Sequence, residues 1–281
     1  MKAFIFKCIL PFCLAGLLIS CNTEARKVWD NNIQFDSLFV DKTYHLLDVD
    51  TNPGCSLQIR FIYPVNYTDK DIASLVQQQF IAGFFGEEYV NLTPEEAAER
   101  YVNTFIQTYK EDEKNFQLER ENHGDEISES WFSIEESLSN QIVYNQNDLL
   151  SFVVHSESYY GNAAHGAHRH INRVVNLKDG QQIREDEIFI EDYQDDLAKI
   201  IVDAIALSKN VEIAELENIG FFNVGEIVPN KNFYADEIGI TYTFNEYEIA
   251  AYVVGNITVQ IPYDKIRHLM RSTSPLSGIA F

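Results

Sequence analysis

The chain has 281 residues, of which 46% are hydrophobic, so it can bury a sizeable core, and its length suggests about two domains. Its 43 acidic residues outnumber 21 basic ones, which gives a formal net charge of −22 at pH 7. This charge repels nucleic acid, which we exclude as a partner, and it attracts cationic partners. An acidic surface is also common in soluble proteins without a cationic partner, and both interpretations stay open.

The N-terminus has the order of parts found in a signal peptide. Lys2 and Lys7 form a basic start, and the apolar stretch that follows is shorter than the roughly 20 residues of a membrane span. The stretch ends in Leu-Ile-Ser-Cys at Cys21, which resembles the bacterial lipobox. We therefore expect residues 1–20 to be a lipoprotein signal peptide and residues 21–36 to be a tether.

This interpretation predicts both a lipid attachment site and a cellular location. Acylation of Cys21 would attach the protein to a lipid bilayer on the extracytoplasmic side of a bacterial cell envelope. Loss of Lys2 and Lys7 with the signal peptide would lower the net charge to −24. The alternative is an ordinary secretory signal with a chance cysteine.

The remaining cysteines predict a fold without disulfides. Cys8 and Cys13 lie in the signal peptide and Cys21 would carry lipid, which leaves Cys55 alone. Cys55 opens an alternating apolar run and is predicted to be a buried strand residue. A catalytic thiol is the alternative role.

The first elements follow from apolar periodicity. Alternation predicts strands at 37–47 and 55–63. A helix is predicted to begin near Thr68, and a second begins at Thr93, where Glu96 can close a capping box. Apolar residues at a spacing of about four give the second helix a buried face.

The rest of the chain is predicted to be mixed. Residues 110–125 are charged and indicate a loop. Further strands are predicted at 129–138, 141–145, 149–158, 171–177, 233–244 (as a pair) and 257–262, and helices at 192–208 and 263–271. Because strands and helices come in clusters, we expect an α+β fold of two packed α+β subdomains, 37–148 and 149–281, with mostly antiparallel sheets.

One histidine cluster could carry chemistry. His165, His168 and His170 are close enough in sequence to share a metal, so they are the candidate ligands. The chain has no HExxH motif and no paired Cys-x-x-Cys to support such a site. The other interpretation is a tight turn between strands, in which Gly161 and Gly166 permit positive φ. No catalytic motif is present, and no cofactor is predicted.

Two segments resemble a known family. The first resembles the family's Tyr-x-Gly-Gly-Ala-His-Gly loop and comprises Tyr160, Gly161, Asn162, His165 and Gly166. The second resembles a Tyr-Glu-Ile-Ala segment that leads to a terminal helix and comprises Tyr247, Glu248, Gly255 and Tyr263. The resemblance is to the RsiV-like C-terminal domain family, whose module also precedes the catalytic domain of PdaC-type peptidoglycan deacetylases.

The resemblance implies an extracytoplasmic binding module, because the module in RsiV binds lysozyme. It makes residues 37–148 a PdaC-like subdomain and residues 149–281 an RsiV-like domain. The first segment becomes a candidate ligand-contact loop, although Asn162 departs from the family's glycine. In the second segment we expect a core aromatic at Tyr247, a tight turn at Gly255 and the start of a helix at Tyr263.

Three functions stay open at this point. The leading one is a non-catalytic envelope lipoprotein that binds a lysozyme-like cationic protein or a peptidoglycan-related glycan. The second is a metal-assisted envelope glycan hydrolase or deacetylase-like enzyme that uses His165, His168 and His170. The third is a structural or assembly lipoprotein with a protein partner.

Overall fold

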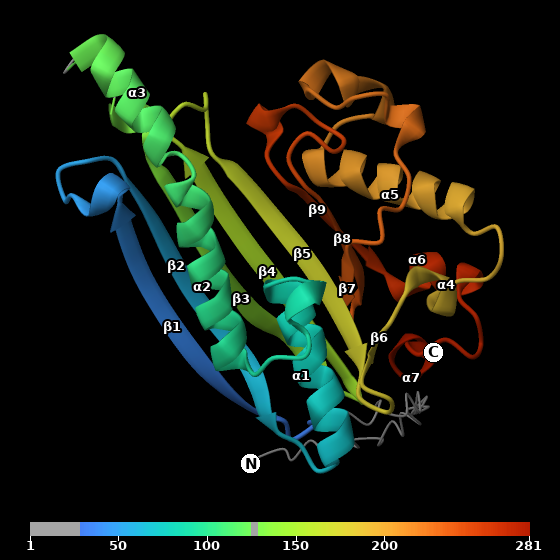
Figure 1. The fold of residues 1–281 in the computed structure, drawn as a ribbon. Coiled ribbons are helices and arrows are strands. Elements are labelled where there is room, and N and C mark those ends of the chain that lie inside the picture. Colours follow the sequence, from blue (N-terminus) through green and yellow to red (C-terminus); the bar gives the residue numbers. More distant parts are fainter. Residues whose placement is uncertain (1–28, 125–128) are drawn as a thin grey trace, which may run out of the picture.

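The computed structural model describes residues 29–124 and 129–281, which form an α+β fold with two mostly antiparallel sheets, as predicted (Figure 1). The predicted signal peptide and Cys21 lie outside the described residues. The first sheet has the order β1-β2-β3-β4-β5-β6, in which only β2 and β3 run parallel. Its strands are β1 (Gln34–His45), β2 (Gly54–Asn66), β3 (Ile134–Gln146), β4 (Leu149–Tyr160), β5 (Ala167–Asn176) and β6 (Gln181–Gln182).

Two helices, α1 (Lys70–Phe84) and α2 (Pro94–Lys110), cover one face of this sheet (Figure 1). The strand alternation predicted from the sequence decides which face they cover. Leu57, Ile59 and Phe61 all point toward the helices and are fully buried. Burial of each such side chain stabilises the folded protein by roughly 1.5–3 kcal/mol. This face of the sheet, together with the helices, forms the core of the first layer.

Both helices begin at side-chain caps. The predicted capping box is confirmed, because the Glu96 backbone N–H donates to Thr93 Oγ1 at 3.2 Å and the Thr93 N–H donates to the Glu96 carboxylate at 3.0 Å. The first helix is capped by Asp69 rather than Thr68. Its carboxylate accepts the N–H groups of Asp71 and Ile72 at 3.0 and 3.2 Å.

The prediction of a loop at 110–125 is wrong, since the helix α3 (Glu113–His123) occupies most of this segment. Only Phe116 of this helix is buried, and its ring meets Phe132 edge to face with centroids 5.3 Å apart. A helix with one buried residue shows no apolar periodicity, which is why the sequence pattern did not reveal it.

The strand β3 also differs from the prediction, because it is continuous where two strands were expected. A bulge between Ile142 and Tyr144 shifts its register against β4. The bulge moves Tyr144 to the core of the second layer, while Ile142 stays with the first. The break predicted at 139–140 lies before this bulge, at the polar residues Ser139 and Asn140. Asn140 stays within the strand because its side chain accepts the Ile62 N–H and donates to the Ile62 carbonyl, each at 2.8 Å.

The strand β1 begins at Gln34, inside the range predicted as tether. The residues just before it are already attached to the β3–β4 hairpin. Asp30 forms a β-bridge with Gln146, and the Asn31 side-chain amide donates to the Leu149 carbonyl at 2.8 Å. The described part of the predicted tether is therefore packed on the sheet.

The predicted division after residue 148 falls in the turn of this hairpin. Asn147 and Asp148 have φ of +57° and +61°, as a two-residue hairpin turn requires. The first sheet continues through this turn as far as Gln182. In the structure, the change from one sheet to the other comes after β6.

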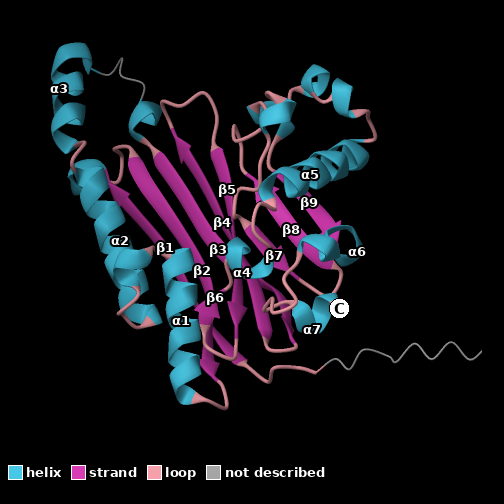
Figure 2. Cartoon of the chain, turned by 90° about the vertical axis from the view of Figure 1, so that its right-hand side faces the viewer, coloured by secondary structure: helices cyan, strands magenta, loops and turns pink. Residues whose placement is uncertain are grey.

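The second layer is a smaller sheet with its own core (Figure 2). Its elements are α4 (Glu185–Ile188), α5 (Gln194–Lys209), β7 (Phe233–Ala235), β8 (Gly239–Phe244), β9 (Ile257–Pro262), α6 (Tyr263–Ile266) and α7 (Ser277–Ala280). The layers share apolar contacts through Leu149 and Val174, and the Ser151 hydroxyl donates to the Ala235 carbonyl at 2.6 Å. Within the described residues, no helix is both long and apolar enough to span a bilayer.

Candidate functional site: a groove beside the edge of the first sheet

From His168 to Asn172, the outer edge of β5 is covered by side chains of the second layer, because β6 pairs only with Val175 and Asn176. Outward-facing backbone N–H groups of an edge strand need partners. The donors are the N–H groups of His168, His170 and Asn172, and the acceptors are the side chains of Glu246, Asn245 and Asn232 in that order, at 3.0, 2.7 and 2.7 Å. These bonds take the place of a neighbouring strand and hold the two layers together.

The covering side chains also return donors to the strand. The amide groups of Asn232 and Asn245 both donate to the carbonyl of His170, at 3.0 and 3.1 Å. Glu248 holds the two covering loops, because its carboxylate accepts the Asn245 N–H and the Asn230 side chain, each at 2.7 Å. Glu248, which belongs to the second resemblance segment, therefore has a structural role.

A groove of about 630 Å³ runs along this covered edge. One wall is formed by Arg169 and Arg173 of β5, and the other by the segments 230–232 and 245–248. His165 also lines it, just before β5 begins. The groove therefore combines basic, acidic, amide and aromatic groups, a mixture that can orient a polar ligand.

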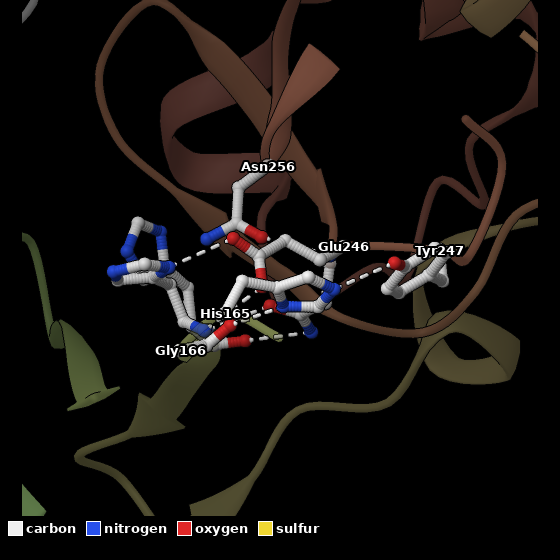
Figure 3. A network of polar contacts seen from close by, with 8 residues as sticks. His165, Gly166, Glu246, Tyr247 and Asn256 are labelled. Atoms are coloured by element: carbon white, nitrogen blue, oxygen red, sulfur yellow. Dashed lines mark hydrogen bonds and ion pairs between the residues drawn. The ribbon is translucent and has the colours of Figure 1, made fainter. Parts of the chain in front are cut away.

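An aromatic cluster of His165, Tyr247 and Tyr252 lies beside the groove, which His165 and Tyr247 line. Figure 3 shows the contact between His165 and Tyr247. The His165 ring stacks on Tyr252 with centroids 3.7 Å apart, and Tyr247 lies 5.9 Å from His165. The Nδ1 atom of His165 is 2.8 Å from the Gly166 carbonyl, which can only accept, so Nδ1 carries the hydrogen. Nε2 then accepts from the Tyr247 hydroxyl at 2.9 Å, which fixes the exposed ring of Tyr247 in place.

The three candidate metal ligands have different partners. His165 bonds to Tyr247, the His168 Nδ1 atom lies 2.8 Å from a Glu246 carboxylate oxygen, and His170 meets His155 edge to face at 4.4 Å. Burial lowers the pKa of both His155 and His170. In the part of the chain that the structure describes, no three His, Cys, Asp or Glu side chains gather as a metal site would require.

The candidate ligand-contact loop is exposed at its tip, where Asn162 and His165 lie, and Tyr160 is also exposed. Gly161 and Gly166 do not use the positive φ that glycine permits. Close packing explains the glycines instead. A Cβ atom on Gly161 would lie only 1.4 Å from the backbone oxygen of Ser130, and one on Gly166 would lie 3.1 Å from the Ser158 oxygen.

The second resemblance segment divides into structural and exposed residues. Tyr263 is buried, begins α6 and donates its hydroxyl to the Asp236 carbonyl at 2.9 Å. Gly255 makes a tight turn with φ of +74°. The prediction that Tyr247 is a core aromatic is wrong, since its side chain is 57% exposed and its φ is +65°. The hydrogen bond from its hydroxyl to His165, and not burial, holds the Tyr247 side chain in place.

Cys55 behaves as predicted. It is buried in β2, and burial raises the pKa of its thiol to about 11. A thiol in that state is a poor nucleophile at neutral pH. Sequence reasoning missed the groove residues Arg173, Asn232 and Asn245, because single polar residues in strands and loops leave no periodic signal.

Comparison with known proteins relates both layers to described families. Residues 53–168 match the family described as Deacetylase PdaC, and residues 186–264 match a Protein of unknown function (DUF3298). No curated protein matches the chain.

Two crystal structures have the same overall arrangement. A member of the DUF3298 family from Bacteroides fragilis is 29% identical, with a TM-score of 0.83 over 90% of this chain and 99% of that one. A DUF3298 family protein from Pseudomonas aeruginosa is 13% identical, with a TM-score of 0.58 over 87% and 97%, and shows a shared fold. The chain is therefore similar to PdaC in its first layer and to the DUF3298 family in its second.

Proposed function

We propose that this protein is a non-catalytic binding module of the bacterial cell envelope, and that the groove beside β5 binds an envelope glycan related to peptidoglycan. The observation that carries this proposal is the aromatic cluster of His165, Tyr247 and Tyr252. Its rings are held by stacking and by a hydrogen bond, and Tyr247 remains exposed at the groove. An exposed ring in a fixed orientation offers an apolar face with a polar rim, which suits the face of a sugar ring.

The match of the first layer to PdaC supports an envelope setting. The name of the matched family denotes a deacetylase, whereas this chain shows no catalytic motif. The partners of the three histidines favour a structural role for those side chains over metal-assisted catalysis. Metal analysis of the purified protein distinguishes these roles, because stoichiometric zinc that is lost on His168→Ala would favour the hydrolase alternative.

A sedimentation assay with purified peptidoglycan sacculi tests the proposed function. The wild-type chain should co-sediment with sacculi, and Tyr247→Ala should bind clearly less while keeping its thermal midpoint. Trp131→Ala is the matched control, because Trp131 is 65% exposed but does not line the groove. Absence of wild-type binding, or equal loss in both variants, would contradict the proposal.

A lysozyme-like cationic protein is a second candidate ligand, favoured by the distribution of charge. A neighbouring hollow of about 260 Å³, which shares His168 with the groove, is lined by Glu135, Glu136 and Glu157. The whole chain has a net charge of −22. An acidic surface accelerates encounter with a cationic protein, and the effect weakens with salt. Titration with lysozyme at low and physiological salt tests this candidate, and no binding at either salt would remove it.

We further propose that Cys21 carries lipid and anchors the module to the membrane. The support is the order of basic, apolar and cysteine residues in the first 21 positions. Mass spectrometry of the protein from membranes should find an acylated N-terminus at Cys21. Cys21→Ser should release the protein from the membrane fraction, and an uncleaved, unlipidated N-terminus would refute the proposal.

A further inference from the structure

Three basic side chains line the groove without acidic partners. Arg169, Arg173 and Lys231 all line it, and among the described residues no carboxylate oxygen lies within 4.0 Å of their charged nitrogens. The chain has twice as many acidic as basic residues, so such a gathering of unpaired cations differs from its overall character.

Of the three, Arg173 gives the strongest evidence for an anion site. It is half-buried, and within the described chain its guanidinium makes one hydrogen bond, to the Asn172 carbonyl at 3.2 Å. A guanidinium has five N–H donors, so four remain for a ligand or water. Burial lowers the pKa of Arg173, and the nearby charge of Glu87 only partly opposes this effect. Burying a cation with only one hydrogen-bond partner destabilises the folded protein. Such a cost is expected where the cation serves to bind an anion.

The carboxylates in the groove are already occupied. Glu246 accepts from the backbone N–H of His168 and pairs with its ring, at 3.0 and 2.8 Å. Glu248 holds Asn230 and Asn245 through both of its oxygens. Because these acids serve the covered strand edge, they are not free to pair with the arginines.

The layout of the groove indicates an extended ligand. Arg169 and Arg173 lie on the same side of β5, four residues apart, which corresponds to about 13 Å along a strand. The aromatic cluster lies beyond Arg169, toward the start of the strand. A ligand that reaches from the cluster to Arg173 therefore needs both a ring to stack and an anionic group.

We propose that the groove binds a glycan that carries carboxylate groups, with Tyr247 stacked on a sugar ring and Arg169 and Arg173 paired with the carboxylates. A planar guanidinium pairs with a carboxylate through two parallel hydrogen bonds, which also fixes the orientation of the sugar. This inference rests on the proposed glycan function and specifies the class of glycan.

Calorimetric titration of the full chain with two matched oligosaccharides tests the inference. The first is a hyaluronan hexasaccharide, in which N-acetylglucosamine alternates with glucuronate. The second is chitohexaose, which consists of N-acetylglucosamine alone and has no carboxylate. The wild-type protein should bind the acidic hexasaccharide at least tenfold more tightly than the neutral one.

Variants then assign the preference to the groove. Arg173→Gln and Arg169→Gln should each weaken binding of the acidic hexasaccharide roughly tenfold, as expected for loss of a charged hydrogen bond, and leave chitohexaose unchanged. Arg169 is exposed, so its variant should fold normally even if Arg173→Gln does not. Lys265→Gln is the matched control, because it removes an exposed cation outside the groove and should change neither affinity.

Each contrary result has a distinct meaning. Equal affinity for both hexasaccharides would overturn the carboxylate inference while leaving glycan binding intact. Binding of sacculi with no binding of either hexasaccharide would also overturn it without touching the proposed function. If an acidic peptide competed as well as the acidic hexasaccharide, the groove would be a peptide site and the inference would fail.

Discussion

Replacement of Asn232 by alanine should reveal how much stability the covered edge of β5 contributes. The Asn232 side chain accepts the N–H of Asn172 at 2.7 Å and donates to the carbonyls of His170 and Thr243 at 3.0 and 2.8 Å. It therefore joins β5, β8 and its own loop. Alanine cannot replace any of these three bonds.

The expected cost follows from the number and burial of these bonds. A typical intramolecular hydrogen bond contributes about 1 kcal/mol net, and a buried group left without a partner costs about 1–3 kcal/mol. Asn232 is only half-buried, so water can reach some of the freed groups. We therefore expect Asn232→Ala to lower the free energy of unfolding by about 2–3 kcal/mol.

Urea denaturation at neutral pH measures this change, and hydrogen exchange localises it to the Asn172 amide, which should lose protection. Asn66→Ala is the matched control, because Asn66 is exposed and makes one side-chain bond, to Gln34 at 3.2 Å. This control should change stability by less than about 0.5 kcal/mol. A cost for Asn232→Ala no larger than that of the control, with Asn172 still protected, would refute a structural role for the covering side chains.

Three further predictions concern other parts of the fold. Gly161→Ala should lower the free energy of unfolding by about 1–3 kcal/mol and lower the thermal midpoint, because its Cβ would overlap the Ser130 oxygen. Gly225→Ala is the control and should leave the midpoint unchanged, because no heavy atom lies within 4 Å of the added Cβ. Equal midpoints for the two variants would contradict the packing explanation. Burial raises the pKa of Glu185 above its usual 4.5, so its protonated form favours folding and the stability it confers is lost as pH rises through the raised value. Urea titrations should therefore show Glu185→Gln gaining stability relative to wild type from pH 4 to 7, and a constant difference would argue against this linkage. Thr93→Ala should lower the unfolding free energy by about 1 kcal/mol through loss of the α2 cap, and an unchanged urea midpoint would show that the cap is dispensable.

The residue pattern alone predicted those elements whose signal is local. The capping box at Thr93 placed the start of α2, because both partners of the box lie within one turn. Alternation predicted β9 at Ile257–Pro262, since a strand with one buried face repeats every two residues. The α+β class followed from the clustering of such elements. The families found by comparison also agree in part with the resemblance, through PdaC.

Only the tertiary structure decided which polar residues meet. Asn172 and Asn232 are 60 positions apart, and His165 and Tyr247 are 82 apart, so no local pattern could pair them. Tyr247 illustrates the limit, because its place in the second resemblance segment predicted a core aromatic, whereas the structure exposes it beside the groove. Periodicity reports burial along one element, but a binding groove forms where edges and loops from distant segments come together.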